Sequence, residues 1–287
     1  MNSLIKISLG TFVAGTLLFT ACRKEKEVDN DTTSAKDNNL AERLFDEVKR
    51  ITDAAADGSL ASSNMKSYQM RDTAILGCAT VTHDTSASPR TLTIDYGTTN
   101  CLCGDGRERR GKIIVSYTGP YRTAGTVITH TFDNFFIEDH QVLGTKTVTN
   151  SGINTAGHTY FTIHVDGSVV KPASAGSGTI TWVSDRVREW IEGESTLLNI
   201  TDDKYSITGN ASGTSSAGTS FTVSITSPLI ISLSCIFETV PKPALVQGTL
   251  EITPSGKPVR TINYGSGACD NTATITVNGN TYTYNMW

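Results

Sequence analysis

The chain has 287 residues, a formal net charge of −4 and only 18% charged residues. This length can bury the core of one large all-β domain or of two smaller ones. The acidic balance argues against nucleic acid as a partner, because phosphate binding needs a stripe of clustered Lys and Arg.

The first residues have the pattern of a secretory signal peptide. Lys6 precedes an apolar run over residues 7–19, which is too short to cross a bilayer as a helix, and the small residue Ala21 precedes Cys22. This end resembles the bacterial lipobox, with Phe19 where that pattern prefers Leu. The resemblance implies removal of residues 1–21 and a diacylglycerol on the Cys22 thiol. An ordinary cleaved signal with a chance cysteine is the alternative.

Residues 22–38 contain a single large aliphatic residue, Val28, so we expect a flexible, lipidated tether. Arg23-Lys24-Glu25-Lys26-Glu27 partly resembles the Lys-plus-acid signals that send lipoproteins to the cell surface in Bacteroidota. Position 23 is not Asp, the usual signal for retention at the inner membrane. We therefore expect the outer membrane, with the protein facing the cell exterior.

Residues 39–58 have the period of an amphipathic helix. Leu40, Leu44, Val48 and Ile51 form one apolar stripe with Phe45 beside it. Asn39 is placed to cap the start and Gly58 to end the helix. We expect the stripe to pack on the sheet that follows. Binding at a membrane interface is the alternative, although the polar face is mixed in charge rather than basic.

Residues 73–287 favour antiparallel β structure. Asn278-Gly279 is a strong turn signal that pairs Ile275 with Tyr282 and Ala273 with Tyr284, so both tyrosines are expected in the core. Asp166-Gly167 predicts a second, weaker hairpin. We expect an all-β fold, either a large, strongly twisted antiparallel meander or a β-sandwich, preceded by one amphipathic helix. Further strand-like runs cover 111–118, 125–138, 142–150, 178–191, 204–211, 219–226, 230–238, 247–252 and 259–264.

A short motif occurs near both ends of the β region and predicts two disulfides. Thr93-Ile94-Asp95-Tyr96-Gly97 is followed by Cys101, and Thr261-Ile262-Asn263-Tyr264-Gly265 is followed by Cys269. Each copy has an upstream cysteine, which predicts Cys235–Cys269 and, by analogy, Cys78–Cys101. Cys103 has Asn271 as its counterpart and is assigned as the free thiol, although it could compete for Cys78.

Several segments resemble a group of uncharacterised Bacteroidota lipoproteins. They are the lipobox, the first T-I-D-Y-G…C copy, G-R-E-R-R-G-K-I-I-V, G-T-K-T-V-T-N, W-V-S-D-R-V-R-E-W-I and the final Y-G-S-G-A-C-D-N-T-A-T-I-T-V-N-G. The resemblance covers most of residues 75–286. Because no activity is assigned to that group, it implies a class and a location but no mechanism.

Catalytic and metal-binding motifs are not found in the sequence. It contains no nucleophile elbow, H-E-x-x-H, P-loop or dinucleotide fingerprint. Cys101-x-Cys103 lacks the gap of zinc-binding pairs. Glu138-Asp139 and Asp202-Asp203 are interpreted as carboxylate pairs at strand edges, and Asp202-Asp203 as the start of a turn, with calcium there as a minor alternative. We therefore expect no catalytic residue, metal or cofactor.

One strand-like segment is a candidate recognition surface. In an extended strand over residues 180–191, Trp182, Arg186, Arg188 and Trp190 share one face. Two tryptophans that flank two arginines could stack on sugar rings or bind an anionic polymer. The alternative interpretation buries the tryptophans under the helix, with the arginines at the rim.

These features favour a non-catalytic lipoprotein, held in the membrane through lipid on Cys22. It would bind an extracellular glycan or an envelope protein, or serve the envelope structurally. A glycan hydrolase and a lipid carrier with an apolar cavity inside a curved sheet are the alternatives.

The lipobox interpretation predicts that Cys22→Ala abolishes lipid attachment. Intact-mass measurement of membrane and soluble fractions should find the wild-type protein without residues 1–21 and with added lipid. The variant should be a membrane-held precursor or a released soluble form. A variant that partitions into detergent with the same mass as the wild type contradicts the interpretation.

Overall fold

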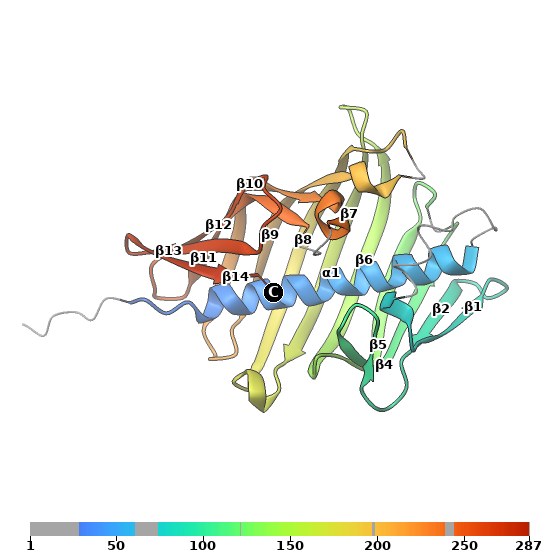
Figure 1. Ribbon diagram of the computed structural model, residues 1–287, viewed down its shortest axis with the longest axis horizontal. Coiled ribbons are helices and arrows are strands. Elements are labelled where there is room, and N and C mark those ends of the chain that lie inside the picture. The colour runs from blue at the N-terminus through green and yellow to red at the C-terminus, as the bar shows by residue number, and fades with distance from the viewer. Residues whose placement is uncertain (1–28, 61–73, 121, 197–198, 239–243, 287) are drawn as a thin grey trace, which may run out of the picture.

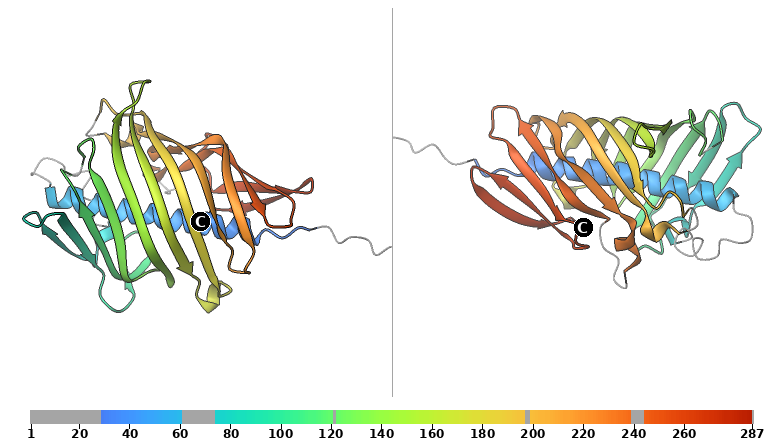
Figure 2. Two further views of the ribbon diagram at one scale, coloured as in Figure 1. Left: turned by 180° about the vertical axis from the view of Figure 1, so that it is seen from behind. Right: turned by 90° about the horizontal axis from the view of Figure 1, so that it is seen from above.

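In the computed structural model, a long helix lies along the concave face of one large curved sheet (Figure 1). The structure describes residues 29–60, 74–120, 122–196, 199–238 and 244–286. Figure 2 shows from behind that the strands cross over α1, and from above that the sheet curves around it. The elements are α1 (Thr33–Leu60), β1 (Thr80–Asp84), β2 (Arg90–Asp95), β3 (Cys101–Leu102), β4 (Glu108–Tyr117), β5 (Val127–Ile137), β6 (His140–Ile153), β7 (Thr159–Val170), η1 (Ala173–Ala175), β8 (Thr179–Glu192), η2 (Ile200–Asp202), β9 (Lys204–Thr214), β10 (Ser220–Ser232), η3 (Leu233–Phe237), β11 (Leu245–Pro254), β12 (Arg260–Ser266), β13 (Thr272–Val277) and β14 (Asn280–Asn285).

The sheet is an antiparallel meander. Its 14 strands follow one another in chain order from β1 to β14, except that the two-residue strand β3 pairs beside this path with β4. Short turns between sequential strands favour this pairing. The all-β prediction is confirmed, and of its two forms the meander is the one observed, as a single open sheet.

The C-terminal hairpin has the predicted register. Ile275 pairs with Tyr282 and Ala273 with Tyr284. Asn278 and Gly279 have φ values of 50° and 78°, as a type I′ turn requires. The expectation for Tyr282 is wrong: its side chain is 39% exposed, whereas Ile275 is 1% exposed. The reason is that β14 is the edge strand, so Tyr282 has a neighbouring strand on one side only.

One predicted turn and one pair of predicted strands differ from the structure. Asp166-Gly167 is not a turn but lies inside β7, where Gly167 pairs with Gly144 of β6. A Cβ atom on Gly167 would lie 2.4 Å from Cζ of Phe45, so the glycine makes room for this α1 side chain. The runs 219–226 and 230–238 form one strand, β10, whose pairing is interrupted around Pro228, followed by the 3₁₀ helix η3.

Helix α1 begins six residues before the predicted start and includes the end of the predicted tether. Asp31 accepts hydrogen bonds from the backbone N–H (2.9 Å) and the hydroxyl of Thr33, so Asp31 rather than Asn39 satisfies donors at the first turn. A flexible tether through residue 38 is therefore wrong. The helical periodicity of apolar residues misses this turn because its packing is polar.

Polar side chains connect α1 to strands along much of the sheet. Asn38 accepts a hydrogen bond from Nε1 of Trp182 at 2.9 Å, and Glu42 accepts one from Nε of Arg186 at 3.2 Å. Both partners lie on β8, and together with contacts to other strands they fix the position of the helix along the sheet. Other contacts of α1 are Asp37–Lys171, Asp37–Ser216, Asn39–Tyr264, Asn39–Tyr284, the Phe45 carbonyl–Lys146 and Glu47 with Arg107 and Arg109, and residues just before the helix add Asp29–Arg260 and Asp31–Lys257.

The apolar core lies between α1 and the concave face. Leu44, Val48 and Ile51 are fully buried, and Phe45 stacks on Trp182 with ring centroids 5.7 Å apart. The stripe therefore packs on the sheet, as expected. In the described part of the chain, no helix is long and apolar enough to cross a bilayer.

The different burial of two paired residues predicts different losses of stability. Ile275→Ala should lower the free energy of unfolding by about 2–5 kcal/mol, since it leaves a cavity in the core. The matched variant Tyr282→Ala, at the opposing position on the edge strand, should cost less than about 1 kcal/mol. Urea unfolding without reductant measures both. Equal losses would contradict this description of the hairpin.

Candidate functional site

The predicted recognition surface is not an exposed face. Trp182 is 2% exposed and lies under α1, and Arg186 is 6% exposed, with its guanidinium 5.9 Å from the centre of the Trp182 ring. The interpretation of these two residues as surface ligands is wrong. The reason is that the face of β8 that carries them is the concave one, which α1 covers.

Arg188 and Trp190 lie farther along the same face and are half-buried. The ring of Tyr205, on the neighbouring strand β9, contacts both of them. Trp190 stacks on this ring with centroids 5.6 Å apart, and the Arg188 guanidinium lies 3.8 Å from its centre. The four residues share a face, as predicted, but their aromatic and charged groups are used in contacts within the fold.

Both predicted disulfides are present. Cys78 is bonded to Cys101 and Cys235 to Cys269, while Cys103 is a buried free thiol. The motif copies are also alike locally: Asp95 accepts a hydrogen bond from the N–H of Gly97, and Asn263 accepts one from the N–H of Gly265, both at 2.8 Å. Cys22 lies outside the described residues, so its lipidation stays a prediction.

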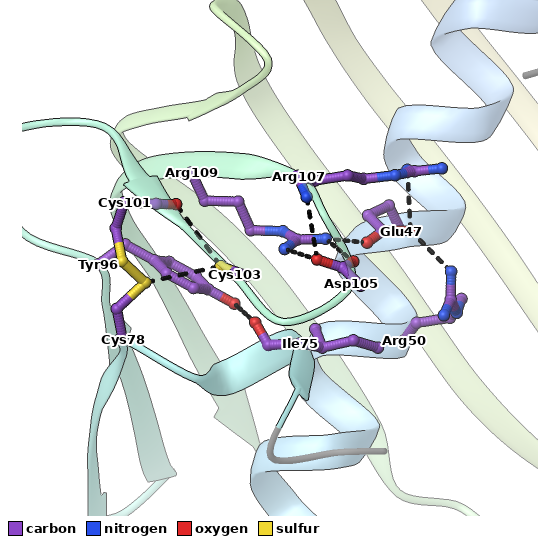
Figure 3. A network of polar contacts seen from close by, with 10 residues as sticks. All are labelled: Glu47, Arg50, Ile75, Cys78, Tyr96, Cys101, Cys103, Asp105, Arg107 and Arg109. Atoms are coloured by element: carbon purple, nitrogen blue, oxygen red, sulfur yellow. Dashed lines mark hydrogen bonds and ion pairs between the residues drawn. A yellow bond between two sulfur atoms is a disulfide. The ribbon is translucent and has the colours of Figure 1, made fainter.

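The most unusual chemistry in the structure is a buried cluster of charges beside the Cys78–Cys101 bridge (Figure 3). Glu47 of α1 accepts hydrogen bonds from Arg50 at 2.9 Å, from Arg107 at 3.3 Å and from Arg109 of β4. Asp105 accepts two more from Arg109, at 2.8 and 2.6 Å. We call Glu47, Arg50, Asp105, Arg107 and Arg109 the Glu47 cluster.

Burial and charge act in opposite directions on the pKa values of this cluster. Burial alone would raise the pKa of Glu47, but Arg50, Arg107 and Arg109 more than offset it and hold that pKa below its usual value. The pKa of Asp105 is lowered too, since its two hydrogen bonds from Arg109 outweigh its burial. Both carboxylates are therefore ionised at neutral pH, unlike a general acid, whose pKa must be raised.

A second group of buried polar side chains lies on the central strands. Nζ of Lys146 donates to the carbonyl of Phe45 at 2.6 Å and lies 3.7 Å from Oδ1 of Asp46. Burial lowers the pKa of Lys146 to about 8 and, with the neighbouring Lys146 charge, that of His130 to about 4. His130 is therefore neutral at physiological pH, with Nδ1 at 3.0 Å from the carbonyl of Lys146.

The sequence interpretation missed the Glu47 cluster. Arg109 belongs to a run of charged residues that would ordinarily face solvent, whereas it is fully buried. One signal was available: Glu47 lies three residues after Leu44 and four before Ile51, inside the apolar stripe. A carboxylate on a buried helix face requires a cationic partner.

The arrangement of the Glu47 cluster is suited to holding α1 against β4. No group of three or more His, Cys, Asp or Glu side chains within the described residues has the arrangement of a metal site. Comparisons with protein-family models, with curated proteins and with solved structures find no match to this chain. Inference about its function therefore depends on the residues themselves.

The burial of Glu47 predicts a large effect of removing its charge. Glu47→Gln should lower the free energy of unfolding by about 3–5 kcal/mol, because Arg109 and Arg107 lose the carboxylate that compensates their burial. Asp139→Asn, which breaks the more exposed pair with Arg110, is the control and should cost less than about 1 kcal/mol. Urea unfolding at pH 7 checks the comparison, and similar losses for the two variants would contradict it.

The same variant should change the dependence of stability on pH. The pKa of Glu47 is lower in the folded protein than its ordinary value of 4.5. The contribution of ionised Glu47 to the free energy of unfolding is therefore complete above pH 4.5. It is lost as the pH falls through the pKa of Glu47 in the folded protein. Glu47→Gln should therefore lose less stability on acidification than the wild type.

Proposed function

We propose that this protein is a lipid-anchored, non-catalytic binding module of the outer membrane, facing the cell exterior, and that it binds an extracellular glycan through the convex face of its sheet. The observation that carries the proposal is that α1 fills the concave face. The convex face of the central strands is then the broad surface left for a partner (Figure 2).

The centre of the convex face is a regular array of exposed side chains. The strand register aligns them in three rows across β7, β8 and β9. Neighbouring strands are about 4.8 Å apart, and successive side chains on one face of a strand about 7 Å apart. The rows of this convex array are Thr162–Val187–Thr208, His164–Asp185–Asn210 and Asp166–Val183–Ser212.

The chemistry of the convex array suits a hydroxyl-rich ligand. Its hydroxyl, amide and carboxylate groups can exchange hydrogen bonds with sugar hydroxyls. Val183 and Val187 are 38% and 39% exposed and offer apolar contact on either side of the all-polar middle row. Nδ1 of His164 lies 2.7 Å from Oδ1 of Asp185, which orients both groups before a ligand binds.

The two alternatives fit the geometry less well. In a lipid carrier, the acyl chain would lie in the concave face of the sheet. It would have to displace α1, whose Leu44, Val48 and Ile51 side chains are fully buried there. For a glycan hydrolase, Glu47 and Asp105 are two carboxylates that meet from distant parts of the chain. Both are engaged by Arg109 and held ionised.

Glycan binding can be tested with the detergent-solubilised full-length protein. On glycan arrays and insoluble polysaccharides, the wild type should bind at least one glycan class. The double variant Val183→Glu/Val187→Glu should weaken this binding about tenfold or more, by removing apolar contact and adding charge. Thr281→Glu/Thr283→Glu, on the exposed edge strand β14, is the control and should bind like the wild type.

Two results would overturn the proposal. One is a folded wild-type protein that binds no glycan; the other is equal binding by the wild type and the Val183→Glu/Val187→Glu variant. Cross-linking of an envelope protein to the convex array in whole cells would support the structural alternative instead.

A further inference from the structure

Three cysteine sulfurs gather where β3 meets β4. The free Sγ of Cys103 lies 3.7 Å from the Sγ of Cys78, which is bonded to Cys101 (Figure 3). The free Sγ of Cys103 is therefore close to van der Waals contact with a sulfur of the disulfide. Within the described residues the other disulfide has no free cysteine beside it, and Asn271 stands at the position that corresponds to Cys103.

The two alternative partners of Cys78 differ in exposure. Cys103 is 3% exposed, whereas Cys101 is half-buried and is followed by Leu102, which is 68% exposed. A thiol at position 101 would therefore be accessible to reagents that reach position 103 poorly. Which of the two cysteines is free decides whether the protein presents a reactive thiol.

We propose that Cys78, Cys101 and Cys103 form an intramolecular thiol–disulfide exchange site, which makes Cys101 a site of thiol modification. The Cys103 thiol gives its proton to solvent, and the thiolate attacks Sγ of Cys78. A Cys78–Cys103 bond forms, the Cys78–Cys101 bond breaks, and Cys101 leaves as a thiolate that takes up a proton. One thiol and one disulfide exist before and after the step, so it consumes no oxidant or reductant.

The surroundings of Cys103 make the exchange slow and dependent on pH. Burial raises the pKa of the Cys103 thiol, and so do the negative charges of Asp105 and Glu47, while the Arg109 guanidinium acts in the opposite direction. The hydroxyl of Tyr96, whose own pKa is raised by burial, also faces this group and is neutral. The thiolate fraction, and with it the exchange rate, therefore rises with pH.

The exchange site is joined to the contacts that hold α1. Cys103 precedes the turn that carries Asp105, and its N–H donates to the carbonyl of Arg107 at 2.8 Å. Asp105 in turn bonds Arg109, which bonds Glu47. A change of partner at Cys78 thus acts on the loop that completes the Glu47 cluster.

The test is alkylation of the native full-length protein with iodoacetamide, followed by digestion without reductant and mass spectrometry. We expect label on Cys101 together with a Cys78–Cys103 disulfide, and labelling that speeds up about tenfold per pH unit below the pKa of the attacking thiol. The Cys235–Cys269 bridge is the internal control and should stay unlabelled. Label on Cys103 alone, or equal labelling of Cys235 and Cys269, would overturn the proposal.

Two variants separate exchange from simple exposure. Cys103→Ser should reduce labelling of Cys101 about tenfold or more, because the attacking thiolate is gone. Cys101→Ser should form the Cys78–Cys103 disulfide and melt close to the wild type. Undiminished labelling of Cys101 in the first variant, or free Cys78 and Cys103 thiols in a folded second variant, would refute exchange.

Discussion

The burial of the concave sheet face by α1 is the constraint on which the rest of this structure depends. A meander of this size is a single layer, and its apolar face needs a second layer to exclude water. Here one helix supplies that layer, so that Leu44, Val48 and Ile51 are buried by strands far apart in the sequence. The curvature of the sheet follows from wrapping around a single cylinder (Figure 2).

Apolar packing alone would let a helix slide or rotate in such a groove, and the polar contacts remove this freedom. Asn38 bonds Trp182 and Glu42 bonds Arg186, both on β8, and Glu47 bonds Arg109 on β4. A shift of α1 by one residue would leave several of these buried groups without partners. Unpaired buried charges are costly, so a misplaced helix would be strongly destabilised. The main effect of these contacts is therefore to select one position of α1 rather than to add stability.

The two motif copies give the ends of the sheet similar local structures with different partners. Tyr96 donates its hydroxyl to the carbonyl of Ile75 at 3.1 Å, whereas Tyr264 donates to Asn39 of α1 at 2.6 Å. Each copy is followed by a cysteine in a disulfide. The copies differ at Cys103 and Asn271, so the end of the sheet that holds the Glu47 cluster is also the end with the buried free thiol. The convex face between these ends is not covered by α1, which lies on the other side of the sheet.

Local patterns in the sequence were sufficient for the helix, the antiparallel class, the Asn278-Gly279 hairpin and both disulfides. Each depends on a periodicity, a turn preference or a repeated motif that short segments carry by themselves. The sequence alone does not determine which face of β8 is buried. Trp182 and Val183 lie on opposite faces of the strand, and only the position of α1 decides which of them is covered. The extra turn of α1, the extended conformation of Gly167 and the burial of Arg109 were also settled by tertiary contacts. In each case the deciding contact comes from a residue distant in sequence. Lys171 pairs with Asp37, Phe45 packs against Gly167, and Glu47 pairs with Arg109.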